Sequence, residues 1–366
     1  MKIAVDAMGG DNAPQAVIEG AALAVRELDC TVILVGDREV IEPLLAKHPH
    51  PEEKIIIKHA SEVVRMDEAP RKALNNKHDA SIRRIFELVH AGEADAAMSA
   101  GNSGAAMLAG LLVLGTLPGV DRPCIGSVLP AAKGRFVLLD AGANVDSKPH
   151  NLVQFAFMGH ALARYTLGID RPKIGLLSIG EEAGKGNEVV RNTYKILRKS
   201  DLNFHGNVEG GDIFNDKVDV IVCDGFVGNV ALKTGEGVVQ VLATRLKAEI
   251  KASLLGRFGY LFMRPALKRF KQRFDYAETG GALLLGLDGI GVIAHGRSNP
   301  VAIKNAIRIT YDYARTKVAM RVREEVESSA ELRQSFGEKV HQVIENIKDK
   351  KIDAAMKDTP SADEVD

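Results

Sequence analysis

Six glycine-containing turns hold the residues of this chain whose types and spacing could do chemistry. Each combines glycine, which lets the backbone approach a ligand closely, with Asn, Asp, Ser or Lys side chains. Backbone N–H groups in such turns, and at the helix starts that follow them, bind anions. Any one Gly-Asn turn is also compatible with ordinary turn chemistry, but repetition at successive strand ends favours a phosphate site. The turns are DAMGGDNAP (6–14), SAGNSGA (99–105), DAGANVDSKP (140–149), SIGEEAGKGN (178–187), DGFVGN (224–229) and AHGRSN (294–299).

Two ionisable residues in these turns are candidates for catalysis. Lys185 could neutralise phosphate or stabilise the negative charge that develops on a thioester oxygen or sulfur. Asp224 could accept a proton from dihydrogen phosphate or orient Lys185. The alternative for both is a solvated turn charge, and for His295 it is a structural hydrogen bond. The residues that we assign to phosphate or substrate binding are Gly9, Gly10, Asp11, Asn12, Asn102, Ser103, Asn144, Lys148, Asn187, Asn229, His295, Ser298 and Asn299.

Familiar cofactor motifs do not fit this sequence. From Gly180 to Lys185 the spacing is one residue short of a Walker loop, and Gly186 occupies the position of the Ser or Thr that would hold magnesium. The run 289–294 matches a dinucleotide-binding pattern, but it leads into a strand rather than from a strand into a helix. The sequence contains no close cluster of metal-ligand residues. We therefore expect no nucleotide, metal or other cofactor.

The elements that must position these turns alternate along the chain. Short apolar runs predict strands at 2–6, 31–35, 54–59, 96–99, 135–140, 173–178 and 218–224. Helical periodicity lies between them at 15–28, 79–91, 152–165 and 188–200. This alternation predicts a mainly parallel sheet covered on both faces, which is a three-layer α/β/α sandwich. Ligands of such sheets bind at the carboxyl ends of the strands, so we expect the turns to meet at one edge of the sheet.

Composition narrows the class of protein. The 366 residues include 48 Lys and Arg, 48 Asp and Glu, and no Trp, which argues against nucleic-acid binding. Three isolated cysteines, Cys30, Cys124 and Cys223, are typical of a reduced, cytoplasmic protein. The uncharged stretch 96–120 contains polar residues and many glycines, so we interpret it as a buried strand, turn and helix rather than a membrane span.

A basic amphipathic segment follows the turn 224–229. A helical pattern runs from 236 for about 20 residues, and 251–274 holds seven cations and no acid. We expect Pro265 to break or begin a helix. The segment fits an anionic membrane surface or an acidic helical carrier protein, and a buried dimer helix is the alternative. Its assigned contact residues are Leu254, Leu255, Phe258, Leu261, Phe262, Lys268, Arg269 and Lys271.

The six turns, in order from residue 2 to about residue 315, resemble the signature turns of the bacterial phosphate acyltransferase family of phospholipid synthesis. The resemblance implies that inorganic phosphate attacks the thioester of a long-chain acyl-carrier protein, which yields acyl phosphate and free carrier protein. A downstream membrane acyltransferase then uses acyl phosphate to acylate glycerol 3-phosphate. The implied fold is that of phosphate acetyltransferases and of isocitrate or isopropylmalate dehydrogenases. The implied catalytic pair falls on Lys185 and Asp224, without metal or nucleotide.

Further expectations concern location and assembly. The resemblance implies a cytoplasmic enzyme associated peripherally with the inner face of the membrane, and we expect a homodimer. We expect one α/β/α domain over 1–335, which includes 236–274, and a charged tail over 336–366. The alternatives are a phosphate acetyltransferase acting on short acyl-CoA, a decarboxylating dehydrogenase, and a non-enzymatic membrane scaffold. Departures from the family pattern occur at 77–82, Ser147, His150 and Pro300.

Overall fold

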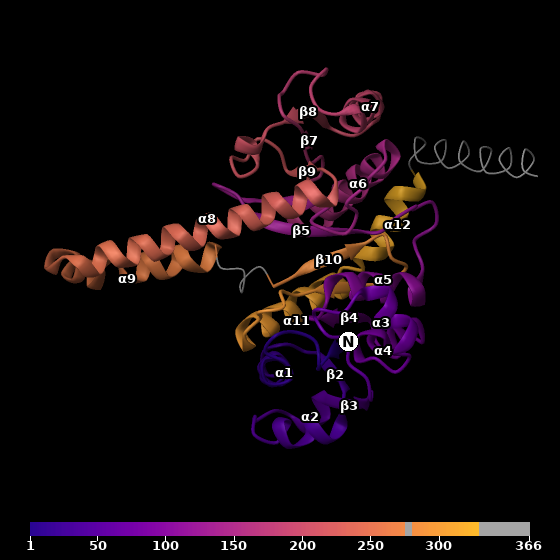
Figure 1. Cartoon of the computed structure of the whole chain (residues 1–366), viewed down its shortest axis with the longest axis vertical. Helices are drawn as coiled ribbons and strands as arrows, with labels where there is room; N and C mark the ends of the chain where they lie inside the picture. The colour runs from indigo at the N-terminus through magenta and orange to yellow at the C-terminus, as the bar shows by residue number, and fades with distance from the viewer. Residues whose placement is uncertain (275–279, 329–366) are drawn as a thin grey trace, which may run out of the picture.

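The computed structural model describes residues 1–274 and 280–328, without the side chains of Arg257 and of residues 271–274. A sheet of 11 strands, in the order β3-β2-β1-β4-β11-β10-β5-β6-β9-β7-β8, runs through the molecule (Figure 1). The strands are β1 (Lys2–Asp6), β2 (Thr31–Gly36), β3 (Ile55–His59), β4 (Ala96–Ser99), β5 (Cys124–Pro130), β6 (Arg135–Leu139), β7 (Ile174–Leu177), β8 (Phe204–Val208), β9 (Val220–Val222), β10 (Ala282–Leu285) and β11 (Gly291–Ile293). The helices are α1 (Gln15–Glu27), α2 (Arg38–Leu45), α3 (Pro70–Asn76), α4 (Ser81–His90), α5 (Ser103–Leu114), α6 (Pro149–Leu162), α7 (Glu188–Leu197), α8 (Gly225–Ala252), α9 (Leu254–Phe274), α11 (Pro300–Arg315) and α12 (Val318–Ser328).

The sheet consists of two parallel blocks that run in opposite directions. The first block is β3-β2-β1-β4-β11, and the second block is β6-β9-β7-β8. Between them β10 is antiparallel to both β11 and β5, and β5 is antiparallel to β6. The predicted mainly parallel sheet is therefore confirmed. The expectation that all six turns meet at one edge of the sheet is wrong, because the antiparallel pairings reverse the strand direction between the blocks.

Helices cover both faces of the sheet, which confirms the three-layer α/β/α fold. On one face a continuous apolar cluster joins α1 and α11 to α6 and α12. On the other face α3, α4 and α5 cover the first block, and the first turns of α8 cover the second block. Strands β1 and β6 are almost wholly buried, as the apolar character of their sequences requires.

Helices α8 and α9 lie side by side and project from the sheet as a hairpin (Figure 1). Helix α8 has 28 residues and begins at Gly225 rather than at 236, so the turn 224–229 is its first turn. Helix α9 continues through Pro265, which contradicts the expected helix break. An interior proline removes one backbone hydrogen bond, a loss that this 21-residue helix accommodates. The expected tail, 336–366, lies outside the described residues.

Candidate active site

Two turns of the first block interlock. The backbone N–H of Asp11 donates to the carbonyl of Gly296 at 2.8 Å, and the side-chain amide of Asn12 donates to the carbonyls of Arg297 (3.3 Å) and Ser298 (3.2 Å). Gly10 has a φ of 115°, which favours glycine, and its backbone packs against this junction. The structure therefore brings together the predicted residues of the turns 6–14 and 294–299.

A buried aspartate at the end of β1 accepts hydrogen bonds from the residues next to this junction. Asp6 is 2% exposed at the carboxyl end of β1, and it accepts hydrogen bonds from the Ser99 hydroxyl (2.7 Å) and the Met8 N–H (3.2 Å). The Gly9 N–H also donates to it, and Ser99 in turn accepts from Gly101 N–H at 3.0 Å. Burial raises the pKa of Asp6, while these hydrogen bonds oppose the rise. Asp6 and Ser99 thus tie the turn 99–105 to the turn 6–14.

Several predicted asparagines act as helix caps. The carboxamide oxygen of Asn102 accepts from Ala105 N–H, that of Asn187 from Val190 N–H and that of Asn299 from Ala302 N–H. Both amide hydrogens of Asn102 are also used, since the amide donates to the carbonyls of Met66 and Glu68 at 3.1 Å. These side chains position the amino ends of α5, α7 and α11. Ser103 is exposed beside Asn102, whereas Ser298 is only 4% exposed.

A second buried aspartate shapes the turn 140–149 of the second block. One carboxylate oxygen of Asp140 accepts from the N–H groups of Ile125 (3.0 Å), Gly142 (3.1 Å) and Ala143 (3.0 Å). The other accepts from Asn144 through its backbone (2.7 Å) and its side-chain amide (2.8 Å). Asp140 is fully buried. The turn is therefore organised around this carboxylate, and the Asn144 side chain points into it.

The turn 140–149 also positions the start of α8. The carbonyl of Asn144 accepts from Gly225 N–H at 2.7 Å. A Cβ on Gly228 would lie 1.9 Å from the carbonyl oxygen of Asp140, so only glycine permits this close approach. Asn229, one residue further, lies against Gly142. Lys148 is exposed at the end of the turn, where α6 begins.

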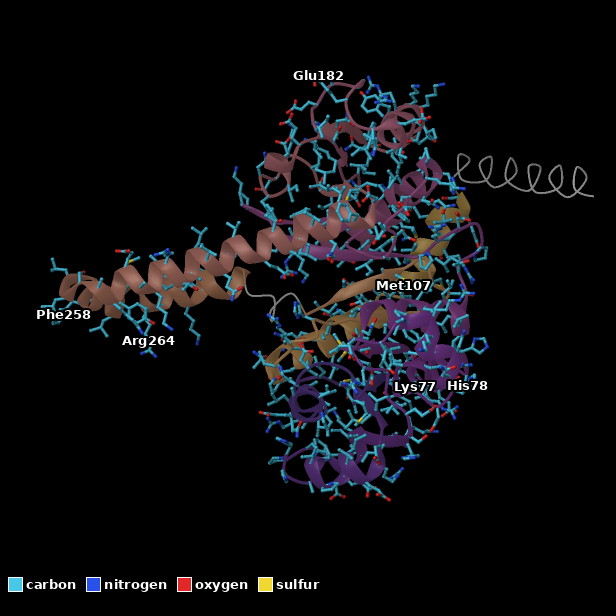
Figure 2. The ribbon with its side chains drawn as sticks, viewed as in Figure 1. Lys77, His78, Met107, Glu182, Phe258 and Arg264 are labelled. Atoms are coloured by element: carbon cyan, nitrogen blue, oxygen red, sulfur yellow. The ribbon has the colours of Figure 1, made fainter. Side chains whose placement is uncertain are left out.

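Asp224 and Lys185 follow neighbouring strands. Asp224 caps α8 by accepting from Val227 N–H at 2.8 Å. Lys185 is exposed on the turn after β7, which pairs in parallel with β9. Among the described residues no hydrogen bond or ion pair joins the side chains of Lys185 and Asp224. Figure 2 shows Glu182 of the same turn at the outer end of the second block, so the turn opens to solvent.

Side chains from outside the turn that carries Lys185 hold it in place. The side-chain amide of Asn207, which is 2% exposed, donates to the carbonyl of Glu182 at 2.8 Å. Lys217 forms ion pairs with Glu181 of this turn and with Asp212, the second at 2.8 Å. The pKa of Asp212 is lowered to about 2, and the hydrogen bond from Lys217 is the largest cause. These contacts hold the base of a turn whose tip remains exposed.

Sequence reasoning missed Lys233. Its Nζ lies 3.3 Å from Nε2 of His295, so α8 of the second block reaches the turn 294–299 of the first. Lys233 also pairs with Glu236 at 2.9 Å. The signal was the helix that follows Asp224, because Asn229 and Lys233 are four residues apart and share one face of it.

An apolar cluster joins the two blocks next to these turns. It contains Ala141 of the turn 140–149, Ala105 of α5 and Ile293 of β11. Ala143 of the same turn and Leu232 of α8 pack against this cluster. The cluster therefore joins the turn 140–149 of the second block to α5 and β11 of the first, although the turns of the two blocks do not share one sheet edge.

The departures from the family pattern have structural partners. His150 Nε2 lies 3.0 Å from Asp121, which also accepts from Asn151. Pro300 occupies the first turn of α11, where its missing N–H removes no helical hydrogen bond. Lys77, next to His78 in Figure 2, pairs with Glu68 at 2.6 Å and so holds the segment that Asn102 contacts.

The hairpin exposes most of its assigned contact residues. Phe258 lies at its outer end in Figure 2, and Lys268 and Arg269 are exposed. The side chain of Lys271 lies outside the described residues. No helix in the described ranges is long and apolar enough to cross a membrane. The exposed fractions of the assigned apolar residues are Leu254 74%, Leu255 86%, Phe258 66%, Leu261 63% and Phe262 86%.

Comparisons with known proteins agree with the sequence and the fold. The model of a family described as fatty acid synthesis protein matches residues 1–321. A phosphate acyltransferase of Geobacter sp. (strain M21) is 53% identical over 329 residues, which are 90% of this chain and 94% of that protein. A phosphate acyltransferase of Geobacter sulfurreducens is 52% identical over 328 residues, with 90% and 95% covered.

Solved structures share the architecture. A phosphotransacetylase from Streptococcus pyogenes matches with a TM-score of 0.60 and 20% identity, over 86% of this chain and 94% of that chain. A branched-chain phosphotransacylase from Enterococcus faecalis V583 matches with a TM-score of 0.52 and 13% identity, over 86% and 99%. These likenesses show the fold. Together with the family match and the relatives, they lead to one conclusion: the chain belongs to the fatty acid synthesis protein family and is an acyltransferase.

Proposed function

We propose that this protein converts long-chain acyl-[acyl-carrier protein] and inorganic phosphate to acyl phosphate and free carrier protein. The observation that carries the proposal is Lys185, an exposed cation on a braced turn whose strand adjoins the strand leading to Asp224. Both residues belong to a chain whose relatives are named phosphate acyltransferase. The product would feed the acylation of glycerol 3-phosphate by a downstream membrane acyltransferase.

The proposed reaction is a direct displacement. A phosphate oxygen forms a bond to the thioester carbonyl carbon, and the C–S bond breaks with its electron pair going to sulfur. Asp224 takes the proton that phosphate loses, and the departing thiolate regains a proton. Lys185 stabilises the negative charge on the carbonyl oxygen or on sulfur. The remaining contribution of the turns is to position the two substrates.

A thioester-consumption assay tests this function. The purified chain is incubated with palmitoyl-[acyl-carrier protein] or acetyl-CoA, with and without phosphate, and free thiol and acyl phosphate are measured. We expect phosphate-dependent thiol release from the palmitoyl substrate and much less from acetyl-CoA. A preference for acetyl-CoA would support the short-chain alternative instead, and the absence of phosphate-dependent release from either substrate would contradict both.

We further propose that the hairpin contacts the inner face of the cell membrane. Helix α9 combines highly exposed leucine and phenylalanine side chains with exposed Lys268 and Arg269. Apolar side chains together with cations suit an interface of anionic lipid. This location would release acyl phosphate beside the membrane enzyme that consumes it. Docking of the acidic carrier protein on the same cations is the alternative.

A homodimer is also proposed, through the apolar face of α8. Val238, Val241, Leu242 and Leu246 recur at helical spacing and are 48–63% exposed. A contiguous apolar surface of this kind is typical of an interface between proteins. Sedimentation of the purified chain tests the proposal, since a mass near twice 39.4 kDa is expected. A single species at monomer mass at micromolar concentration would contradict it.

A further inference from the structure

A glycine at the start of the turn 178–187 determines the path of the Lys185 side chain. A Cβ on Gly180 would lie 2.9 Å from Lys185 Cγ and 3.3 Å from Lys185 Cδ, with Oε2 of Glu182 at 3.0 Å as its third close neighbour. The aliphatic stem of Lys185 therefore passes directly over Gly180, in space that a side chain at this position would fill. The φ of Gly180 is not in the left-handed region, so its backbone does not require glycine. The packing of the Lys185 stem is what requires it.

A buried asparagine holds the backbone from which this stem starts. The carbonyl of Glu182 accepts two hydrogen bonds, one from the Lys185 N–H at 3.0 Å and one from the side-chain amide of Asn207 at 2.8 Å. A carbonyl oxygen has two lone pairs, so both bonds form at the same time. Asn207, which lies in β8, is therefore joined to the backbone of Lys185 through one shared acceptor.

The other polar atom of Asn207 gives no second reason for its burial. The side chain is 2% exposed, and its Oδ1 has no hydrogen-bond partner among the described residues. Burying an amide costs free energy where it is not hydrogen-bonded, so asparagine is a poor choice for core packing alone. On the other side of Lys185, the guanidinium of Arg191 donates to the carbonyl of Gly186 at 2.6 Å. The backbone is thus held both before and after Lys185.

We infer that Gly180 and Asn207 are positioning residues for Lys185, Gly180 because it leaves room for the stem and Asn207 because it holds the backbone. Lysine has a flexible four-carbon stem and loses much side-chain entropy when its ammonium group is fixed. A stem whose path is set before the substrates arrive loses less of that entropy in the reaction. The inference rests on the proposed function, since it takes Lys185 as the cation that stabilises the developing negative charge.

Two glycines of the same turn provide a matched pair of substitutions. Gly180→Ala places a methyl group against the Lys185 stem, whereas a Cβ on Gly184 would meet no atom within 4 Å. The φ of Gly184 is not in the left-handed region either, so alanine fits the backbone at both positions. In the thioester-consumption assay we expect Gly180→Ala to lower kcat by about tenfold with little change in KM for either substrate. Gly184→Ala should keep the wild-type kcat.

A second pair of variants tests Asn207. Asn207→Ala removes the hydrogen bond to the Glu182 carbonyl and should also lower kcat with little change in KM. Its control is Asn203→Ala, because the side-chain amide of Asn203 makes the same kind of bond, 3.0 Å long, to the carbonyl of Arg171. Thermal unfolding of each variant shows that it is folded. Wild-type kcat in folded Gly180→Ala and Asn207→Ala would overturn the inference.

Repeating the substitutions in Lys185→Ala distinguishes positioning from a general structural effect. Residues that act through Lys185 have no ammonium group left to position there, so Gly180→Ala and Asn207→Ala should lower kcat no further in that background. A loss as large as in the wild-type background would show that the effect does not pass through Lys185, and the inference would be wrong.

A measurement without turnover separates the inference from the proposed function. Isotope-labelled reductive methylation makes the lysines visible by NMR, and the signal of Lys185 is identified by its loss in Lys185→Arg. We expect Gly180→Ala to shift this signal more than Gly184→Ala does, and equal shifts would overturn the inference. If the wild type released no thiol with phosphate, the proposed function would be wrong and the Lys185 signal would still decide the inference.

Discussion

At the scale of single residues, the charged side chains of this site divide into buried supports and exposed reactive groups. Asp6 and Asp140 are buried at the ends of β1 and β6, where they accept backbone N–H groups of the turns that follow. Lys185 is exposed and makes no ion pair among the described residues. Burial suits a carboxylate that shapes a turn, while exposure suits a cation that must meet a substrate.

Asp224→Asn separates catalysis from capping. Asparagine caps a helix as well as aspartate does, so the hydrogen bond to Val227 N–H should survive while the charge is lost. We expect an unchanged unfolding temperature and a kcat lower by about 10²–10⁴-fold. Lys185→Ala should lower kcat by about 10²–10³-fold. Wild-type kcat in both variants would refute the catalytic assignment, and Lys195→Ala on exposed α7 serves as the control.

Asp140→Asn tests the role of a buried carboxylate in the turn 140–149. The new amide NH₂ group must face N–H donors that the carboxylate oxygens now satisfy. Leaving buried donors without acceptors should lower the free energy of unfolding by about 2–4 kcal/mol. Urea denaturation measures this change. Asp146→Asn, an exposed aspartate of the same turn, should change the stability by less than about 0.5 kcal/mol, and equal effects of the two substitutions would contradict our account.

At the scale of elements, helix starts and braced turns determine where the reactive groups lie. Asn102, Asn187, Asp224 and Asn299 each cap a helix that follows a strand of the sheet. The strands thus set the position of the turns, and the caps set the direction in which the helices leave. The turn of Lys185 needs additional support because it contains three glycines, Gly180, Gly184 and Gly186, and ends in an exposed tip.

Lys217→Met should loosen the turn of Lys185 without unfolding the protein. The substitution removes the ion pairs to Glu181 and Asp212, so we expect kcat to fall by about tenfold and the unfolding temperature to change little. Lys199→Met, an exposed cation after α7, is the control. Equal kcat in the two variants would show that the brace does not position Lys185.

The same brace predicts a pH dependence of stability. The folded pKa of Asp212 is lowered from 3.8 to about 2, so its contribution to stability is present above pH 4 and is lost as pH falls through 2. The wild type should therefore lose more free energy of unfolding between pH 4 and 2 than Asp212→Asn does. Parallel pH profiles from urea denaturation would contradict this prediction.

At the scale of the whole molecule, α8 connects the two blocks of the sheet with the projecting hairpin. Its first turn caps the second block, Lys233 reaches the first block, and its remaining length projects with α9 (Figure 1). Asp224 at the start of α8 and the proposed membrane contact on α9 therefore belong to one helical hairpin. A substrate held by the turns would be near the base of the hairpin.

Charge reversal at the adjacent Lys268 and Arg269 tests the membrane contact. Each cation near an anionic surface contributes about 1 kcal/mol, so reversing both should weaken binding to phosphatidylglycerol vesicles by at least about tenfold. Vesicle sedimentation measures the binding, and added salt should weaken wild-type binding as well. The matched control reverses the exposed pair Arg198 and Lys199. Equal binding by both double variants would remove the assignment.

Much of the fold and of the candidate site follows from local sequence pattern. β1 and β4 begin and end where the apolar runs predict, and the other predicted strands differ by at most two residues at either end. A run of apolar residues indicates a buried strand, and such a run can be recognised from neighbouring residues alone. Four strands, β5, β8, β10 and β11, are missing from the predicted set. The pairings of β10 with β5 and of β11 with β4 join distant parts of the chain, which a local pattern does not indicate.

The sequence by itself determined the family resemblance, the α/β/α layers and the residues at each strand end, because these depend on residue type and local periodicity. Only the tertiary structure decided how those residues are used. It placed the two blocks in opposite directions, turned the carboxamides of Asn102 and Asn144 toward the protein, and brought Lys233 to His295. Each of these outcomes depends on contacts between residues far apart in the chain, and a local pattern carries no record of such contacts.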